Sequence, residues 1–161
     1  KHRGEAYFGT IFPVPRSRAM KTVQDLLALK APGAVTIASG ASVFDALKLM
    51  ADKDVGAVVV VDDRRVVGIM SERDYARKVI LLNKSSHETP VSEIMTERVL
   101  FVKPTQSLDE CMAIVTSKRI RHLPVLNGDR LIGVLSIGDL VKAAISEQDF
   151  TIKQLESYIT S

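Results

Sequence analysis

Apolar positions along the chain predict the same order of elements twice. Each copy opens with a short helix and a short strand, continues with an amphipathic helix and two apolar strands, and closes with a third helix. Apolar residues spaced three and four apart indicate the helices, and unbroken β-branched runs are typical of strands buried on both faces. The first copy occupies residues 23–30, 35–37, 42–50, 57–61, 66–70 and 72–82, and the second occupies 91–95, 100–102, 107–115, 122–126, 131–135 and 137–146.

The two ends of the chain lie outside this order. A last amphipathic helix is predicted over residues 147–161, where Ile152, Leu155 and Ile159 share one face. Such a face covers either a core edge or a subunit interface, and we favour the interface. Residues 1–19 predict an irregular arm. Because Met20 would make a natural start, this arm is either a non-native leader or a genuine arm that docks on a partner subunit.

The repetition extends to individual residues at a constant offset of 65. An earlier stretch, residues 23–27, matches residues 91–95 at an offset of 68, so a loop in the first copy is three residues longer. A unit of about 60 residues buries too little surface to be more than marginally stable alone, so we expect the copies to pack together. The matched pairs include Ser42 with Ser107, Val60 with Val125, Gly68 with Gly133, Ser71 with Ser136, and Asp74 with Asp139.

The most informative repeated stretch is a Gly-x-x-Ser-x-x-Asp motif at residues 68–74 and 133–139. It follows an apolar strand and opens a helix. Ser followed three residues later by an acid is typical of a capping box, which would be its whole role in one interpretation. In the other, spare amides at the helix start attract an anion while the carboxylate accepts hydrogen bonds from a vicinal diol. Repetition in register favours the second interpretation.

Composition indicates an ordinary globular protein, with 46% hydrophobic and 25% charged residues. The net charge of +3 lies entirely in residues 1–19, and the remaining residues balance. Bulk charge therefore gives no reason to expect nucleic-acid binding. No apolar run approaches the roughly 20 residues that span a membrane, and we expect no membrane contact. The single cysteine, Cys111, is predicted to be a small buried hydrophobe, and a cytoplasmic location is expected.

The two motifs, the Ile120–Val125 stretch and the Ser71–Lys78 stretch resemble a tandem pair of cystathionine-β-synthase-type (CBS) domains, as in small stand-alone bacterial signalling proteins. The resemblance implies an α/β fold of two β-α-β-β-α repeats packed as a pseudo-twofold pair, plus the C-terminal amphipathic helix. The repeats would occupy residues 20–83 and 91–146, joined by a linker at 84–90 and followed by the helix at 147–161. The resemblance also implies adenosine-nucleotide binding in clefts between the repeats, without catalysis.

Site residues carried over from the resemblance come from both repeats. Asp74 and Asp139 would accept from ribose hydroxyls, and Ser71 and Ser136 would hold the sugar or a phosphate. The repeats differ where phosphate would bind, because Arg121-His122 corresponds to Gly56-Ala57 and Arg73 corresponds to Gly138. Without the resemblance, we would favour the interpretation of Arg121 and His122 as only a solvated pair at a strand entrance. The full expected set is Ser71, Arg73, Asp74, Arg121, His122, Ser136, Asp139, Thr36, Ile37, Ala57 and Phe101.

The function expected from these observations is a regulatory, non-catalytic sensor of AMP, ADP or ATP, with NAD or S-adenosylmethionine as variants and no required cofactor. A homodimer and a regulated protein partner are expected. The alternatives are a structural or interaction protein with unoccupied clefts and, less favoured, a nucleotide-processing enzyme. No recognisable set of nucleophile, general base or metal ligands, and no Gly-rich phosphate loop, supports the enzyme.

Overall fold

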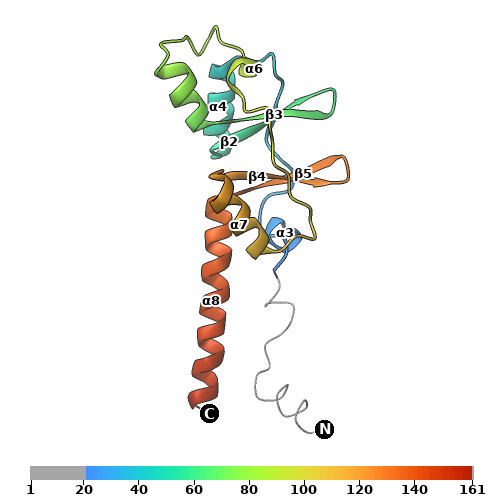
Figure 1. Ribbon diagram of the computed structural model, residues 1–161, viewed down its shortest axis with the longest axis vertical. Helices are drawn as coiled ribbons and strands as arrows, with labels where there is room; N and C mark the ends of the chain where they lie inside the picture. Colours follow the sequence, from blue (N-terminus) through green and yellow to red (C-terminus); the bar gives the residue numbers. More distant parts are fainter. Residues whose placement is uncertain (1–20, 161) are drawn as a thin grey trace.

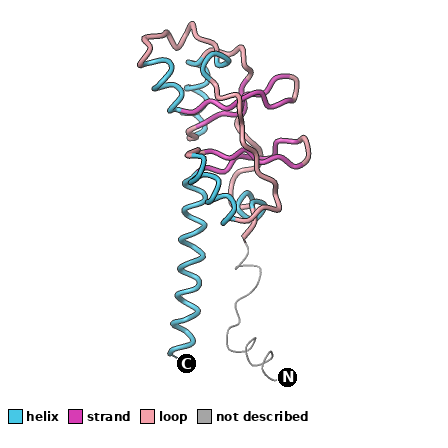
Figure 2. Tube along the Cα trace, viewed as in Figure 1, coloured by secondary structure: helices cyan, strands magenta, loops and turns pink. Residues whose placement is uncertain are grey.

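Two β-hairpins, one from each repeat, lie one above the other and point in the same direction (Figures 1 and 2). The computed structural model describes residues 21–160, so the predicted arm at 1–19 lies outside the described residues. Strand β2 (Ala57–Asp62) pairs antiparallel with β3 (Arg65–Ser71), and β4 (His122–Asn127) pairs antiparallel with β5 (Arg130–Ser136). Each hairpin has a register shift at the equivalent place, Val60/Val61 and Val125/Leu126. The four predicted hairpin strands are confirmed.

The short strand that precedes each hairpin differs between the repeats. In the first, β1 (Thr36–Ile37) pairs parallel with β2, and the Val59 amide donates to the Val35 carbonyl at 3.0 Å. The predicted strand at 100–102 is wrong, because only Val102 forms a bridge, to Val125. The reason is Pro124, which occupies the position of Val59 and has no N–H to donate.

The central helices begin and end alike. Helix α4 (Val43–Lys53) and helix α7 (Leu108–Lys118) start after Ser42 and Ser107, whose hydroxyls accept from the amide three residues on. Both end at a residue with left-handed backbone, Asp54 and Arg119, each with φ of 53°. The predicted burial of Cys111 on α7 is confirmed, and desolvation raises the pKa of its thiol to about 11.

The helices that follow the two motifs differ strongly. After α5 (Glu72–Tyr75) the backbone widens into the π-helical segment η1 (Ala76–Ile80), where the Leu81 amide donates to the Ala76 carbonyl. In the second repeat, α8 (Ile137–Thr160) runs for 24 residues. The predicted division into helices 137–146 and 147–161 is wrong: no Pro or Gly interrupts residues 139–160, so the chain continues as one helix that projects beyond the rest of the fold (Figure 1).

The short opening helices are exchanged between the repeats. Helix α3 (Val23–Leu27) buries Val23 and Leu26 in the core of the second repeat, whereas α6 (Val91–Ile94) buries Val91 and Ile94 in the core of the first. Backbone hydrogen bonds fix the exchange, from Val23 to the Gln106 carbonyl and between Ile69 and Thr96 in both directions. Each core is therefore completed by a helix from the other half of the sequence, which makes the pair one folding unit.

Candidate ligand-binding clefts

A first cleft lies between the motif of the first repeat and the loops of the second. We call it the arginine cleft; its volume is about 190 Å³. The first repeat contributes β3, α5 and η1, and the second contributes the loop after α6 and the segment that joins α7 to β4. Its lining comprises Ile69, Ser71, Arg73, Asp74, Arg77, Thr96, Arg98, Val99, Leu100, Arg119, Ile120, Arg121 and His122.

A second cleft lies between the motif of the second repeat and segments of the first repeat. We call it the neutral cleft because its two lysines are matched by two aspartates. Its volume is about 710 Å³, within the range of small-molecule pockets, roughly 300–1,000 Å³. The second repeat contributes Val134, Ser136, Asp139 and His122. The first contributes Lys30, Ala31, Pro32, Gly33, Ala34, Val35, Thr36, Leu49, Lys53, Asp54, Val55, Gly56 and Ala57.

Both motif aspartates form the capping box that the sequence predicts. The Ser71 amide donates to Asp74 Oδ2 at 2.9 Å, and the Asp74 amide donates to Ser71 Oγ at 3.2 Å. The Ser136 amide donates to Asp139 Oδ2 at 2.8 Å, and the Asp139 amide donates to Ser136 Oγ at 3.2 Å. Capping and cleft lining therefore coexist, since the same carboxylates that cap the helices also face the clefts.

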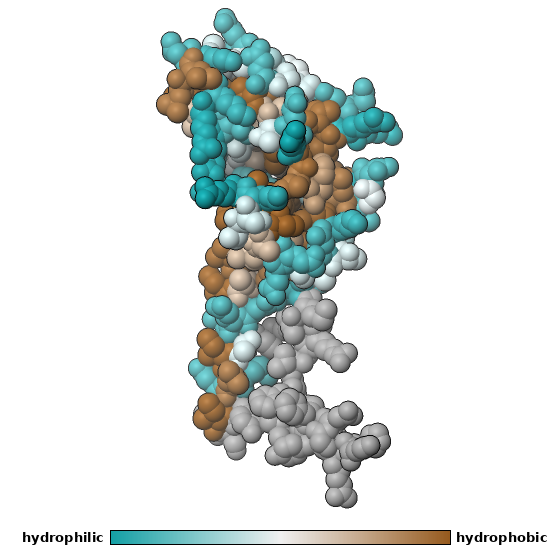
Figure 3. Space-filling model, in the orientation of Figure 1, coloured by the Kyte–Doolittle hydropathy of each residue, from teal (hydrophilic) through white to brown (hydrophobic). Residues whose placement is uncertain are grey.

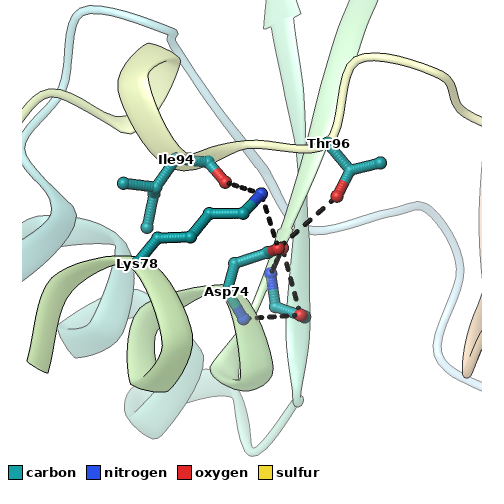
Figure 4. A network of polar contacts seen from close by, with 5 residues as sticks. Asp74, Lys78, Ile94 and Thr96 are labelled. Atoms are coloured by element: carbon teal, nitrogen blue, oxygen red, sulfur yellow. Dashed lines mark hydrogen bonds and ion pairs between the residues drawn. The ribbon is translucent and has the colours of Figure 1, made fainter. Parts of the chain in front are cut away.

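The Asp74 carboxylate is surrounded by donors (Figure 4). Beyond the capping contacts, Asp74 Oδ1 accepts from Thr96 Oγ1 at 3.4 Å and forms an ion pair with Lys78 Nζ at 3.2 Å. Lys78 is anchored in turn, because its Nζ also donates to the Ile94 carbonyl at 2.9 Å. Thr96 and Ile94 belong to the exchanged segment around α6, so the exchange brings them to this aspartate. A diol that binds Asp74 must displace or share these donors.

The Asp139 carboxylate keeps one oxygen available. Lys30 Nζ donates to Asp139 Oδ2 and to the Val134 carbonyl, both at 2.7 Å. Among residues 21–160, no donor contacts Asp139 Oδ1. Burial would raise the pKa of the Asp139 carboxyl, but hydrogen bonds from Lys30 and the Ser136 amide and the Lys30 charge outweigh it, so the pKa is lowered. The ionised carboxylate can therefore accept from a ribose through Oδ1 without losing its present partners.

His122 lines both clefts. It begins β4, close to the start of β2: a Cβ added at Gly56 would lie 3.4 Å from His122 Nε2. Burial is the largest effect on the His122 pKa and lowers it; the charges of Lys30 and Arg121 lower it further, against opposing contributions from Asp139 and Asp74. The neutral imidazole thus forms part of the wall that separates the clefts.

The structure distributes the expected residues over both clefts. Ser71, Arg73, Asp74 and Arg121 line the arginine cleft, while Thr36, Ala57, Ser136 and Asp139 line the neutral cleft. Ile37 and Phe101 line neither. Ile37 packs against the core of the first repeat, and Leu100 takes the place in the arginine cleft that was expected for Phe101.

Several lining residues escape sequence reasoning. Lys30, Thr96, Arg98 and Arg119 lie far along the chain from the motif whose cleft they line, and only the helix exchange brings the first two together with their aspartates. Lys78 lines neither cleft, but its ion pair with Asp74 could have been found, because it lies four residues after Asp74 on the same helical face.

Comparison with known proteins identifies the repeated unit. A family model described as "CBS domain" matches residues 23–80 and again residues 91–146. The chain belongs to the CBS-domain family. Its two CBS domains coincide with the two motif-bearing repeats, which confirms the resemblance and the α/β fold of paired repeats.

Several CBS-domain proteins resemble the chain closely. CBSX3 of Arabidopsis thaliana, a CBS domain-containing protein named as mitochondrial, is 41% identical over 123 residues, which cover 73% of this chain and 60% of that protein. The chain thus spans less than two thirds of this relative. A solved structure from Burkholderia ambifaria MC40-6, whose name proposes a signal-transduction role, has a TM-score of 0.77 and 52% identity, covering 80% of this chain and 96% of that one.

A third structure carries a ligand in its name. PAE2072 from Pyrobaculum aerophilum, a CBS domain protein complexed with AMP, has a TM-score of 0.67 and 25% identity to this chain, covering 78% of this chain and 99% of that one. Within residues 21–160 of the present chain, no helix combines the length and apolar character needed to cross a membrane. In the same part of the chain, no three metal-ligating side chains gather at one place.

Proposed function

We propose that this CBS pair is a regulatory module that binds an adenosine nucleotide between its repeats and does not transform it. The carrying observation is the placement of Asp74 and Asp139, each at a helix start, in a cleft lined by the other repeat. A ligand seated there would touch both repeats at once. Its binding would therefore alter how the repeats pack, which is how occupancy could reach a partner protein.

Two further observations support the nucleotide. The free Oδ1 of Asp139 offers an acceptor for a diol, and the AMP complex of PAE2072 is a precedent within the family. AMP, ADP and ATP are the proposed ligands, with NAD and S-adenosylmethionine as variants that carry the same adenosine. The hydroxyl–carboxylate pair of the arginine cleft, Ser71 Oγ on Asp74 Oδ2 at 3.1 Å, belongs to the capping box of α5, which favours binding over catalysis.

Thermal unfolding with each ligand tests the proposal. A ligand that binds only the folded state stabilises it by about 2.7 kcal/mol at 100 times its dissociation constant. We expect the melting temperature to rise with AMP, ADP or ATP, and mass spectrometry of the incubated nucleotide to find it unchanged. Unaltered melting with all five ligands would leave the unoccupied-cleft alternative, and conversion of the nucleotide would establish the enzyme.

The proposed module includes a second copy of the chain, paired along α8. Exposed apolar side chains of α8 recur at coiled-coil spacing, namely Val141, Ile145, Ile152, Leu155 and Ile159. They form an apolar band along the projecting helix (Figure 3). The heptad position between Ile145 and Ile152 is Gln148, and a polar residue at such a seam specifies its register. A matching helix from a second copy is the simplest partner for this band.

Sedimentation at micromolar concentration tests the dimer. We expect twice the chain mass for the wild type and a monomer for Ile152→Glu with Leu155→Glu, since charges at the seam cannot be buried unpaired. Lys153→Glu, also exposed but outside the band, is the matched control and should remain a dimer. A wild-type monomer, or a dimer that survives the double substitution, would exclude α8 as the interface.

A further inference from the structure

We propose that the arginine cleft is a polyphosphate site that selects ligands with two or more linked phosphates, whereas the neutral cleft does not. The adenosine part of such a ligand rests on the proposed function; the phosphate selectivity rests on the charges alone. Five arginines line the arginine cleft, Arg73, Arg77, Arg98, Arg119 and Arg121, and one aspartate, Asp74, is its only acidic lining residue.

The five arginines come from both repeats. Arg73 lies on α5 and Arg77 on η1, while Arg98 follows α6, Arg119 ends α7 and Arg121 precedes β4. Their convergence is therefore a product of the fold and not of a basic run in the sequence. Planar guanidinium groups bind phosphate oxygens in pairs of parallel hydrogen bonds, so several around one space suit a chain of linked phosphates.

The five arginines have no acidic partner within the part of the chain that the structure describes. Among residues 21–160, none of the five guanidinium groups forms an ion pair with a carboxylate, and Asp74 is already paired with Lys78. Like charges gathered without counter-charges repel one another and destabilise the folded state. All five arginines are exposed, so solvent screens part of this repulsion, and a bound polyanion would offset the rest.

The pseudo-equivalent positions in the opposite repeat carry less positive charge. At the offset of 65, Arg73 corresponds to Gly138, Arg119 to Asp54 and Arg121 to Gly56. Arg77 corresponds to a basic residue, Lys142, but Lys142 does not line the neutral cleft. Asp54 and Arg119 share the same left-handed backbone, so the fold holds the two side chains at matching places with opposite charge. Of the two lysines that line the neutral cleft, Lys30 is already committed to Asp139 and the Val134 carbonyl.

Titration with inorganic phosphate, pyrophosphate and tripolyphosphate tests the selectivity without adenosine. Backbone amide NMR identifies the cleft, with Val99 reporting the arginine cleft and Ala34 the neutral cleft. We expect Val99 to respond, with affinity that rises at least about tenfold from phosphate to tripolyphosphate. The double variant Arg98→Ala with Arg119→Ala should lose at least about tenfold in tripolyphosphate affinity.

A matched control separates the cleft from overall charge. Arg65→Ala with Arg130→Ala removes the same two charges from the hairpins, outside both clefts, and should change the affinity by less than about twofold. Equal losses in the two double variants, or equal affinities for the three anions, would overturn the inference. Pyrophosphate and tripolyphosphate binding at Val99, without any response of either amide to adenosine or AMP, would instead defeat the proposed function and leave the inference standing. If AMP and ADP bound with equal affinity, the proposed function would stand and the inference would fail.

Discussion

The arginine cleft and the neutral cleft arise from one repeated motif, yet they present opposite chemistry. In both clefts an aspartate at the start of a helix forms a capping box with a serine, and segments of the other repeat line the opposite side. The neutral cleft is about 710 Å³, is balanced in charge and leaves Asp139 Oδ1 free, whereas the arginine cleft is about 190 Å³ and surrounds an already engaged Asp74 with arginines. The conserved geometry supplies two places to bind, and a few substituted positions decide what each one binds.

The motif aspartates should give the largest effects. Replacing Asp139 by Ala removes a charged acceptor from a ribose diol, so affinity at the neutral cleft should fall about 10- to 150-fold. Asp74→Ala should lower the nucleotide affinity of the arginine cleft by a smaller factor, because Thr96 and Lys78 already contact Asp74 Oδ1. Calorimetric titration with AMP and its 2′-deoxy form measures both effects.

The control for these variants is a capping box that lines neither the arginine cleft nor the neutral cleft. Glu110→Ala breaks the Ser107 box of α7, costs roughly 1 kcal/mol of stability and should leave nucleotide affinity unchanged. Wild-type affinity at both clefts in both aspartate variants would reduce the motif to a helix cap.

Replacing the glycines at equivalent hairpin positions, Gly68 and Gly133, by alanine should lower the free energy of unfolding by different amounts. A Cβ at Gly68 would meet Met95 Sδ at 2.6 Å and the Thr96 carbonyl oxygen at 3.0 Å, so Gly68→Ala should cost about 1–3 kcal/mol. At Gly133 the close atom is Leu27 Cδ2 at 2.7 Å, the end of a side chain that can turn away, so Gly133→Ala should cost less than about 1 kcal/mol. Urea unfolding measures the two costs, and equal costs would contradict the asymmetry.

Exchanging the two left-handed cap residues should move phosphate preference between the clefts. Asp54→Arg should raise the affinity of the neutral cleft for ADP relative to AMP by about fivefold. Arg119→Asp should lower the same ratio of affinities at the arginine cleft by a similar factor. The shared φ of 53° means that neither backbone needs to change. Competition titrations read by the Val99 and Ala34 amides check the result, and a preference unaltered in both variants would remove charge as its cause.

The smallest expected effect is the pH dependence of stability that comes from His122, which lines both clefts. The pKa of His122 is lowered in the folded state, so below about pH 6.5 the unfolded chain gains the proton first and stability falls as the pH drops through the folded pKa. Above that window His122 is neutral in both states and contributes no pH dependence. Unfolding free energies at pH 8, 7, 6 and 5 should therefore decline less steeply in His122→Gln than in the wild type. Parallel slopes would mean that the imidazole is not held neutral.

Local patterns predicted much of this fold, but not its long-range contacts. The hairpins, both capped central helices and both motifs follow from hydrophobic period and capping residues, because these depend on neighbours in sequence. The failed strand at 100–102 could have been foreseen, since Pro124 cannot donate to it. The exchange of α3 and α6 could not, because both repeats offer similar apolar partners and only packing decides between them. Lys30 and Thr96 enter the clefts through that exchange.

The most direct test of two unequal clefts is a parallel titration of the wild type with adenosine and with ADP, followed at the Val99 and Ala34 amides. The larger, neutral cleft should bind adenosine first, so Ala34 should saturate before Val99. With ADP the order should reverse, with Val99 saturating at concentrations about tenfold lower than Ala34. The same order of saturation for both ligands, or parallel curves at the two amides, would contradict the account.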